Sequence, residues 1–154
     1  MKNNYSQSIH DKDYDEFIQD IELLIRNVNS VIKRRGREIL QDFNITPPQF
    51  IALQSLTKEG DLTIGELSDR LFLACSTVTD LVDRMEKNEL VKRYRDDKDR
   101  RIVRIKVLEK GHKLISEVIA ARQEYLKNIL KDLSKSERER IIFALTQLNE
   151  LMNH

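Results

Sequence analysis

The chain has 154 residues, a length that suits one compact domain with a moderate core and is short for two. Charged residues make up 34% of it while glycine and proline are scarce, a balance typical of long helices with few loops. Its net charge of +1 excludes a chain that is basic throughout, so a nucleic-acid surface would need local clustering of charge.

The N-terminal segment MKNNYSQSIHDKDYDEF lacks the apolar core of a signal peptide. No stretch approaches the roughly 20 apolar residues that span a membrane, and the single cysteine, Cys75, cannot form a disulfide within the chain. We therefore expect a cytoplasmic protein with no membrane partner.

A long first helix is predicted from Asp13 to about Gln41, where apolar residues recur at helical spacing. They form two seams, one through Phe17, Ile21, Leu24, Val28, Val31 and Ile39 and one through Ile18, Ile25 and Ile32. Two seams indicate two surfaces to cover, the helix's own core and a partner. A single broad core stripe is the alternative.

The next two helices are short. Thr46 is a predicted N-cap, with Pro47 at the first helical position, and Gly60 ends that helix. An extended piece at residues 62–64 leads into the third helix, GELSDRLF.

The segment STVTDLVDRMEKN predicts a fourth helix, with Ser76 placed to cap it. Four apolar side chains share one face of it: Val78, Leu81, Val82 and Met85. The other face is polar: Ser76, Thr79, Asp80, Asp83, Arg84 and Lys87, with Thr77 at its margin. Two short helices joined by a tight turn, the second rich in hydroxyl groups at its start, form a helix-turn-helix pattern.

A β-hairpin is predicted from residues 90–94 and 102–107, joined by the polar loop 95–101. Val103, Ile105 and Val107 share one face of its second strand and are expected to fix it to the core. Between Lys92 and Lys106 the chain carries eight basic residues against three acidic ones. The rest of the chain reads as a helix over residues 112–133 with two apolar stripes, then a last helix opened by a capping box of Ser134 and Glu137.

Three helices followed by a hairpin describe a winged helix. The predicted helix STVTDLVDRMEKN fits the major groove of DNA, and the cationic hairpin can reach phosphates or the minor groove. A solvated edge, charged only to resist aggregation, is the plain alternative for the hairpin. A helical protein-interaction module with a basic hairpin is a second reading of the chain; salt-dependent binding to duplex DNA would distinguish it. No nucleophile elbow, phosphate-binding glycine loop or metal triad is visible, so we do not expect an enzyme.

The order of these parts resembles the MarR family of bacterial transcriptional regulators over nearly the whole chain. The most specific segments are ITPPQFIAL, STVTDLVDRMEKNELVKR, and DRR followed by IVRIKVLEKG. The resemblance implies a mainly α fold with a small β-hairpin: a winged helix-turn-helix at 46–107 between dimerisation helices at 13–42 and 112–154, forming one domain over 1–154. It also implies a homodimer on a palindromic operator, more often a repressor than an activator.

The resemblance also assigns DNA-contacting residues. Ser76, Thr77 and Thr79 would lie at the groove-facing start of the recognition helix, and Asp99 and Arg101 match the Asp-x-Arg motif of the wing. In that motif the aspartate orients basic neighbours, while the arginine enters the minor groove or contacts the backbone. Further phosphate contacts would come from Arg84, Arg95, Lys98 and Arg100. Asp96 and Asp97 receive no role and would weaken the hold on phosphate.

The chain departs from the family pattern in three places. Asp80 stands where many relatives carry arginine; it accepts a hydrogen bond from a cytosine or pairs with Arg84, and we favour the ion pair. Glu89 replaces the usual glycine after the recognition helix, so Asn88 is expected to take the left-handed conformation. Leu108 replaces the usual threonine, which leaves the next helix without its cap.

The sequence is compatible with two modes of regulation. In the family, small amphipathic effectors such as phenolic acids bind beside the dimerisation helices, and Phe17, Ile21, Phe50 and Leu114 could line such a site or equally belong to the core. Cys75 precedes a helix start, where the helix dipole favours a reactive thiolate and hence a thiol-based redox switch. We favour a small buried residue in the turn instead.

No cofactor and no metal ion are expected. The histidines His10, His112 and His154 are far apart and lack the paired spacing of metal ligands.

Overall fold

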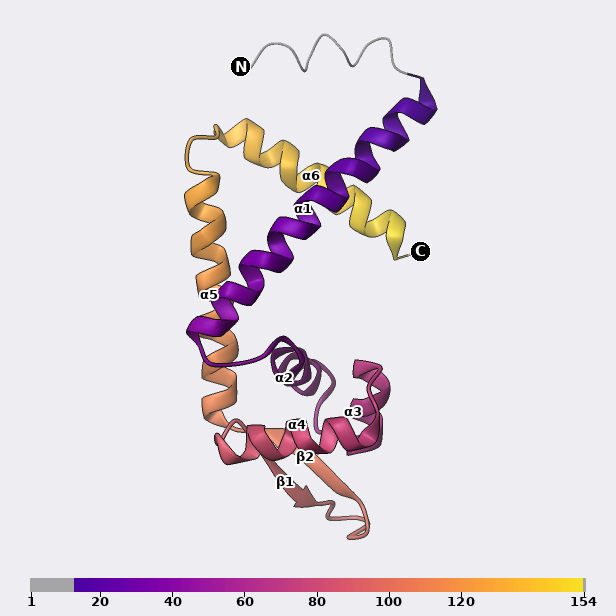
Figure 1. Cartoon of the computed structure of the whole chain (residues 1–154), viewed down its shortest axis with the longest axis vertical. Coiled ribbons are helices and arrows are strands. Elements are labelled where there is room, and N and C mark those ends of the chain that lie inside the picture. Colours follow the sequence, from indigo (N-terminus) through magenta and orange to yellow (C-terminus); the bar gives the residue numbers. More distant parts are fainter. Residues whose placement is uncertain (1–12, 154) are drawn as a thin grey trace. The chain divides into compact units, whose positions relative to one another are not determined.

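The computed structural model describes residues 13–153, which form long helices and one two-stranded antiparallel sheet (Figure 1). The mainly helical fold with a small β-hairpin is the predicted one. The chain divides into two compact units, Met1–Pro47 and Pro48–His154. Among the described helices none combines the length and the apolarity that crossing a membrane requires.

The first unit contains α1 (Tyr14–Asp42), within a residue of the predicted bounds. Its start is set by Asp13, whose carboxylate accepts a hydrogen bond from the backbone N–H of Glu16 at 2.9 Å. Of its apolar side chains only Ile39 and Leu40 are buried. The others of both predicted seams are exposed over more than a third of their surface: Phe17, Ile18, Ile21, Leu24, Ile25, Val28, Val31 and Ile32.

The second unit opens with α2 (Pro47–Glu59), α3 (Ile64–Leu71) and α4 (Cys75–Lys87). Gly60 ends α2 with a φ of 91°, as its position in the sequence predicts. Thr63 and Glu66 form a capping box that starts α3 inside the piece predicted as extended. The largest fully buried side chains of this unit are Phe50, Leu53, Leu67, Val78, Val82, Met85, Val91, Ile105 and Val118.

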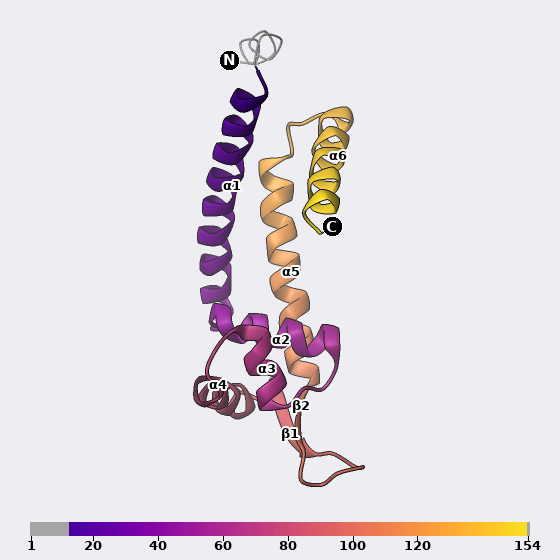
Figure 2. The same ribbon diagram turned by 90° about the vertical axis from the view of Figure 1, so that its right-hand side faces the viewer.

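The hairpin consists of β1 (Val91–Arg95) and β2 (Val103–Val107), paired so that Val91 faces Val107 and Arg95 faces Val103. Its loop projects beyond α4 (Figure 1 and Figure 2). The backbone N–H of Ile105 donates to the carbonyl of Leu62 at 2.8 Å. Leu62, in the connection between α2 and α3, thus forms an isolated antiparallel bridge with β2. The predicted apolar face of β2 is only partly right, because Ile105 is fully buried while Val103 is 38% exposed.

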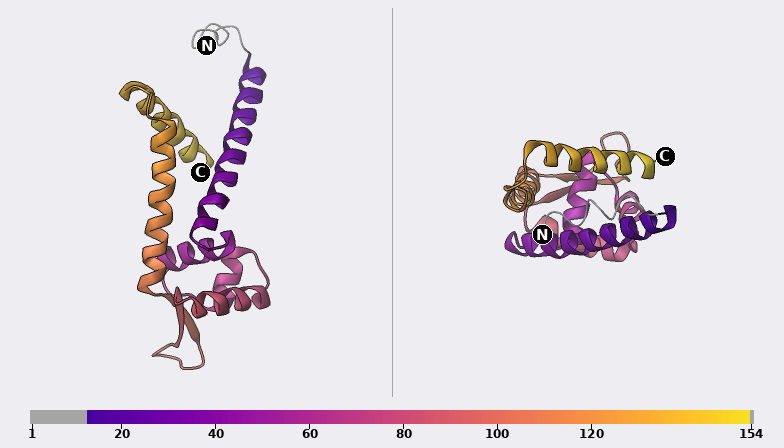
Figure 3. Two further views of the ribbon diagram at one scale, coloured as in Figure 1. Left: turned by 60° about the vertical axis from the view of Figure 1, so that its left-hand side comes forward. Right: turned by 90° about the horizontal axis from the view of Figure 1, so that it is seen from above.

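Two helices complete the second unit, α5 (Glu109–Ile129) and α6 (Lys135–Met152). α5 starts earlier than the predicted residue 112. Its N-cap is Leu108, whose side chain forms no capping hydrogen bond, as expected. The capping box of Ser134 and Glu137 opens α6 as predicted. Figure 3 shows α6 leading away from the far end of α5, and none of its side chains is buried within the chain.

Candidate DNA-binding surface

The recognition helix α4 begins two residues earlier than a cap at Ser76 would imply. Its N-cap is Ala74, which has no side-chain cap, so the prediction that Ser76 caps the helix is wrong. The reason lies at the end of α3, where Phe72 takes a left-handed conformation and the N–H of Leu73 donates to the carbonyl of Ser68. This closes the turn early, and Ser76 becomes the second helical residue.

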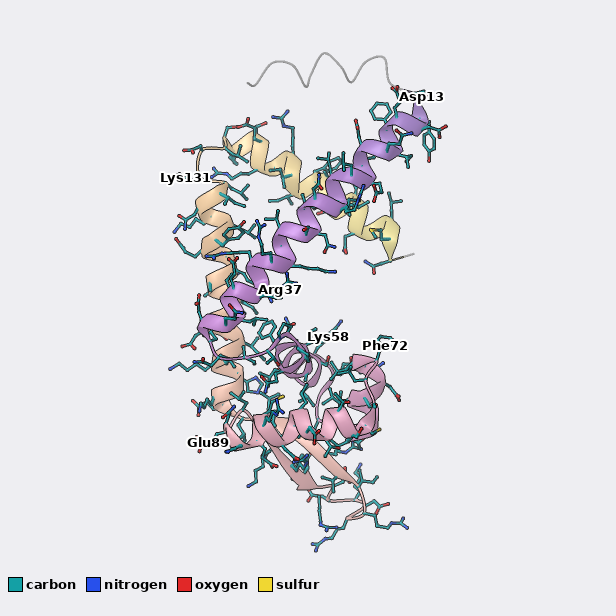
Figure 4. All side chains as sticks on the ribbon, in the orientation of Figure 1. Asp13, Arg37, Lys58, Phe72, Glu89 and Lys131 are labelled. Atoms are coloured by element: carbon teal, nitrogen blue, oxygen red, sulfur yellow. The ribbon has the colours of Figure 1, made fainter. Side chains whose placement is uncertain are left out.

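The far end of α4 also differs from expectation. Asn88 keeps a φ of −88°, and Glu89 itself adopts the left-handed conformation with a φ of 61°. The expectation that Asn88 would do so is therefore wrong. Figure 4 labels Phe72 at the end of α3 and Glu89 just beyond the end of α4. Both are non-glycine residues in a conformation that favours glycine.

The exposed face of α4 is polar at its first turn. The four predicted apolar residues are buried or nearly so, and Ser76, Thr77 and Asp80 are exposed. Thr79 is half-buried, and its hydroxyl donates to the carbonyl of Cys75 at 2.8 Å. Ser76 and Thr77 thus present the hydroxyl groups most open to a ligand on this turn.

Two expectations about this face are wrong. Cys75 is exposed rather than buried in the turn. Within residues 13–153 no ion pair joins Asp80 to Arg84, although both are exposed and one helical turn apart. The Asp80 carboxylate is therefore available to another partner.

A residue that the sequence did not single out attaches α4 to the hairpin. The guanidinium of Arg93 on β1 contacts Asp83 at 2.6 Å and Glu86 at 2.8 Å, and its backbone N–H donates to Glu86 at 2.8 Å. Partial burial disfavours the charged form, but the hydrogen bonds that Arg93 donates to Asp83 and Glu86 outweigh it and raise the pKa of Arg93. The recognition helix and the wing are thereby joined as one body.

The wing loop is internally bonded through Asp99 and Arg101. Arg101 donates to both oxygens of the Asp99 carboxylate, at 3.1 and 3.0 Å, while its side chain stays 92% exposed. These bonds lower the pKa of Asp99 and raise the pKa of Arg101. Arg95 is used differently, since its guanidinium donates to the carbonyl of Arg100 at 2.9 Å. Lys98 and Arg100 carry exposed side chains on the same loop.

Asp96, which had no predicted role, accepts hydrogen bonds from three different residues. Its carboxylate accepts from the N–H groups of Lys98 and Asp99 and from Nε of Arg104 at 2.7 Å. Arg104 first, and then the two N–H groups, lower its pKa to about 2. The sequence signal for it was available: an aspartate whose side chain can bond the N–H two residues on is a common turn former.

The four residues predicted for an effector site lie in different surroundings. Phe50 is 1% exposed, with the guanidinium of Arg122 at 4.8 Å from its ring centroid, and Leu114 is half-buried. Phe17 and Ile21 belong to the first unit and are 38% and 46% exposed. Their part in an effector site stays a prediction.

Metal ligation was not expected from the sequence. The described part of the chain holds no group of three or more His, Cys, Asp and Glu side chains that could bind a metal ion. His10 and His154 lie outside the described residues.

Comparison with known proteins matches this architecture. The model of the MarR family matches residues 45–103, which span α2 to the start of β2. The helix-turn-helix transcriptional regulator YsmB of Bacillus subtilis is 53% identical over 122 residues, 79% of this chain and 84% of the relative. The chain belongs to the MarR family.

Further relatives agree. The transcriptional repressor MdtR of Bacillus subtilis is 30% identical over 82% of this chain and 81% of its own length. The solved structure of a MarR family protein from Bacillus stearothermophilus is 48% identical, with a TM-score of 0.81, over 93% of this chain and all of that one. This MarR-family protein is therefore a DNA-binding transcriptional regulator with a winged helix-turn-helix fold.

Proposed function

We propose that this regulator binds a palindromic operator as a homodimer and represses transcription from it. One observation carries the DNA-binding part of the proposal: the exposed hydroxyl-bearing turn of α4 and the cationic loop of the wing are joined by Arg93. A helix start of this polarity fits the major groove, and the exposed Lys98, Arg100 and Arg101 suit the adjacent phosphates or minor groove. The repressor MdtR among its relatives supports repression.

The apolar surfaces of the long helices support the homodimer. Soluble chains rarely leave extended apolar faces open to water, yet α1 exposes both of its seams. On α5 and α6 the exposed apolar side chains include Ile119, Leu126, Ile129, Ile141, Ile142, Phe143, Leu145, Leu151 and Met152. A second copy of the chain would cover such faces on both partners at once, because a two-fold interface uses the same surface twice.

Selection of bound duplexes from a random DNA pool, together with the mass of the free protein in solution, tests this proposal. A two-fold dimer places its recognition helices about one turn of DNA apart, roughly 34 Å, and should select two inverted half-sites with that spacing. A monomer in solution, or a selected sequence without inverted repeats, would contradict the proposal. Repression is tested separately, by the transcription of a reporter behind the selected sequence.

Thiol oxidation is a second candidate for control of this regulator, favoured by the exposure of Cys75 in the first turn of α4. An oxidised sulfur there would change the size and polarity of the surface beside Ser76. If peroxide releases the wild-type protein from DNA, the Cys75→Ser variant should stay bound. Equal release of both proteins would remove Cys75 from the regulation.

Control by a small amphipathic or phenolic effector is a further proposal for the same protein. Its support is the family membership rather than a cavity around Phe17, Ile21, Phe50 and Leu114. Titration of the operator complex with simple phenolic acids tests it, and unchanged affinity across the series would count against it.

A further inference from the structure

Asp96 lies directly after β1 and forms the base of the wing loop. Its Oδ1 accepts from the N–H groups of Lys98 at 2.9 Å and Asp99 at 3.2 Å, which closes a tight turn. Its own N–H donates to the carbonyl of Ile102 across the loop at 2.9 Å. The loop that presents the wing's cations is therefore folded around one carboxylate.

The other oxygen of Asp96 connects the loop to the body of the unit through Arg104. Arg104 donates from Nε to Asp96 at 2.7 Å and from Nη1 to the carbonyl of Asp61 at 3.1 Å, and Nη1 lies 3.6 Å from the Glu66 carboxylate. The side chains of Asp96 and Arg104 are only 20% and 29% exposed. Asp61 and Glu66 lie just before and within the first turn of α3, so the chain of bonds runs from the base of the wing loop to the helix-turn-helix.

The first strand reaches the same place. The hydroxyl of Tyr94 on β1 donates to the Asp61 carboxylate at 2.7 Å, which raises the pKa of Tyr94. Both strands of the hairpin are thus tied to the connection between α2 and α3, one through Tyr94 and one through Arg104. These two attachments, together with the contacts of Arg93 with α4, hold the hairpin against the helices.

We propose that Asp96 is a positioning residue for DNA binding: its carboxylate holds the wing loop and Arg104 so that the loop's cations face the DNA. The inference rests on the proposed function and assigns a role to an acid that by its charge alone should oppose binding. Removing an acid beside phosphates strengthens binding when only charge matters. Removing Asp96 should weaken it, and this opposite sign makes the role measurable.

Asp97 provides the matched control. It is adjacent, it has the same charge, and it is exposed, with no hydrogen bond or ion pair to another of the residues 13–153. Charge removal at Asp97 therefore reports the electrostatic effect without loss of a structural bond.

The experiment measures binding of the full-length wild type, Asp96→Asn and Asp97→Asn to a fluorescent duplex carrying the sequence that the wild type selects, at several salt concentrations. We expect Asp97→Asn to bind as tightly as the wild type or a few-fold more tightly. Asp96→Asn should bind about tenfold more weakly. It should also show a shallower dependence of log affinity on log salt, because the displaced loop contacts fewer phosphates.

Two further measurements separate positioning from loss of folding. The thermal unfolding midpoint of Asp96→Asn identifies a variant that is merely unfolded; if it is, the milder Asp96→Glu, which keeps the charge but displaces the carboxylate, should weaken DNA binding in its place. In an Arg104→Gln background Asp96→Asn should have little further effect, because the two residues act as one unit.

Affinity of folded Asp96→Asn or Asp96→Glu equal to or above that of the wild type would overturn the inference. So would full additivity of the Asp96 and Arg104 substitutions. Failure of the wild type to select any duplex would instead overturn the proposed function.

Discussion

Gly111 lies in the first turn of α5, close to Leu90, which directly precedes β1. A Cβ atom added there would overlap the carbonyl oxygen of Leu90 and lie 2.7 Å from Cγ1 of Val107. The Leu90 carbonyl is held in place because it accepts the N–H of Leu108 at 2.9 Å. We therefore predict that Gly111→Ala destabilises the protein, although alanine is the better helix former.

The magnitude follows from the competing terms. Overpacking of a tight contact costs about 1 to 3 kcal/mol, and displacement of the Leu90 carbonyl weakens a hydrogen bond worth about 1 kcal/mol. The helix propensity of alanine returns up to about 1 kcal/mol. A net loss of about 2 kcal/mol in the free energy of unfolding is expected, or roughly 4 to 8 °C in the melting temperature.

Gly65→Ala is the matched control, because Gly65 also lies in the first turn of a helix and its added Cβ would meet only Oγ1 of Thr63, at 3.9 Å. Gly65→Ala should leave stability unchanged or raise it by up to about 1 kcal/mol. Both variants are unfolded with urea at one fixed protein concentration, because association between copies of a protein makes its apparent stability depend on concentration. If Gly111→Ala is as stable as Gly65→Ala, the close approach at Leu90 is not a constraint on the fold.

Four other outcomes are expected. Phe72→Gly should raise the free energy of unfolding by about 1 kcal/mol, because Phe72 is 94% exposed with a φ of 53° and loses little contact; a destabilised variant in urea unfolding would contradict this. Attachment of a bulky maleimide to Cys75 should abolish DNA binding in a gel-shift assay, and bound DNA should slow the labelling. Arg101→Ala should weaken operator binding about tenfold while light scattering shows the same molecular mass as for the wild type; equal affinity would remove Arg101 from the interface. The pKa of Asp96 falls from 3.8 to about 2 in the folded protein, so its contribution to stability is complete above pH 3.8 and is lost as the pH falls towards about 2; an NMR titration midpoint near the ordinary value would contradict the bonding described.

Local sequence patterns determined most of the elements of this protein. The sequence predicted the bounds of α1, the capping box that opens α6 and the apolar face of α4. Each of these features depends on residues that are close together on one helix. The spacing of apolar side chains and the four-residue pattern of a capping box can therefore be recognised in the sequence. The same holds for the wing, whose alternating second strand and charged loop predict a hairpin.

The candidate site could be predicted in its residue types but not in its bonds. Asp99 and Arg101 were identified through a short motif, and their contact is local. Asp96 was not identified, because one of the three hydrogen bonds to its carboxylate comes from Arg104 on the opposite strand. Asp80 and Arg84 show the converse error, since favourable spacing on a helix does not ensure that two exposed side chains pair.

The sequence alone thus determined which segments form helices and strands, and where charge and hydroxyl groups gather along them. Only the tertiary structure decided how these segments are fastened: Arg93 bridging β1 to α4, and Arg104 with Tyr94 tying the wing to Asp61. It also decided that Glu89 rather than Asn88 takes the left-handed turn. The physical reason is that these contacts join residues brought together by packing of separate elements, so no spacing along the chain could reveal them.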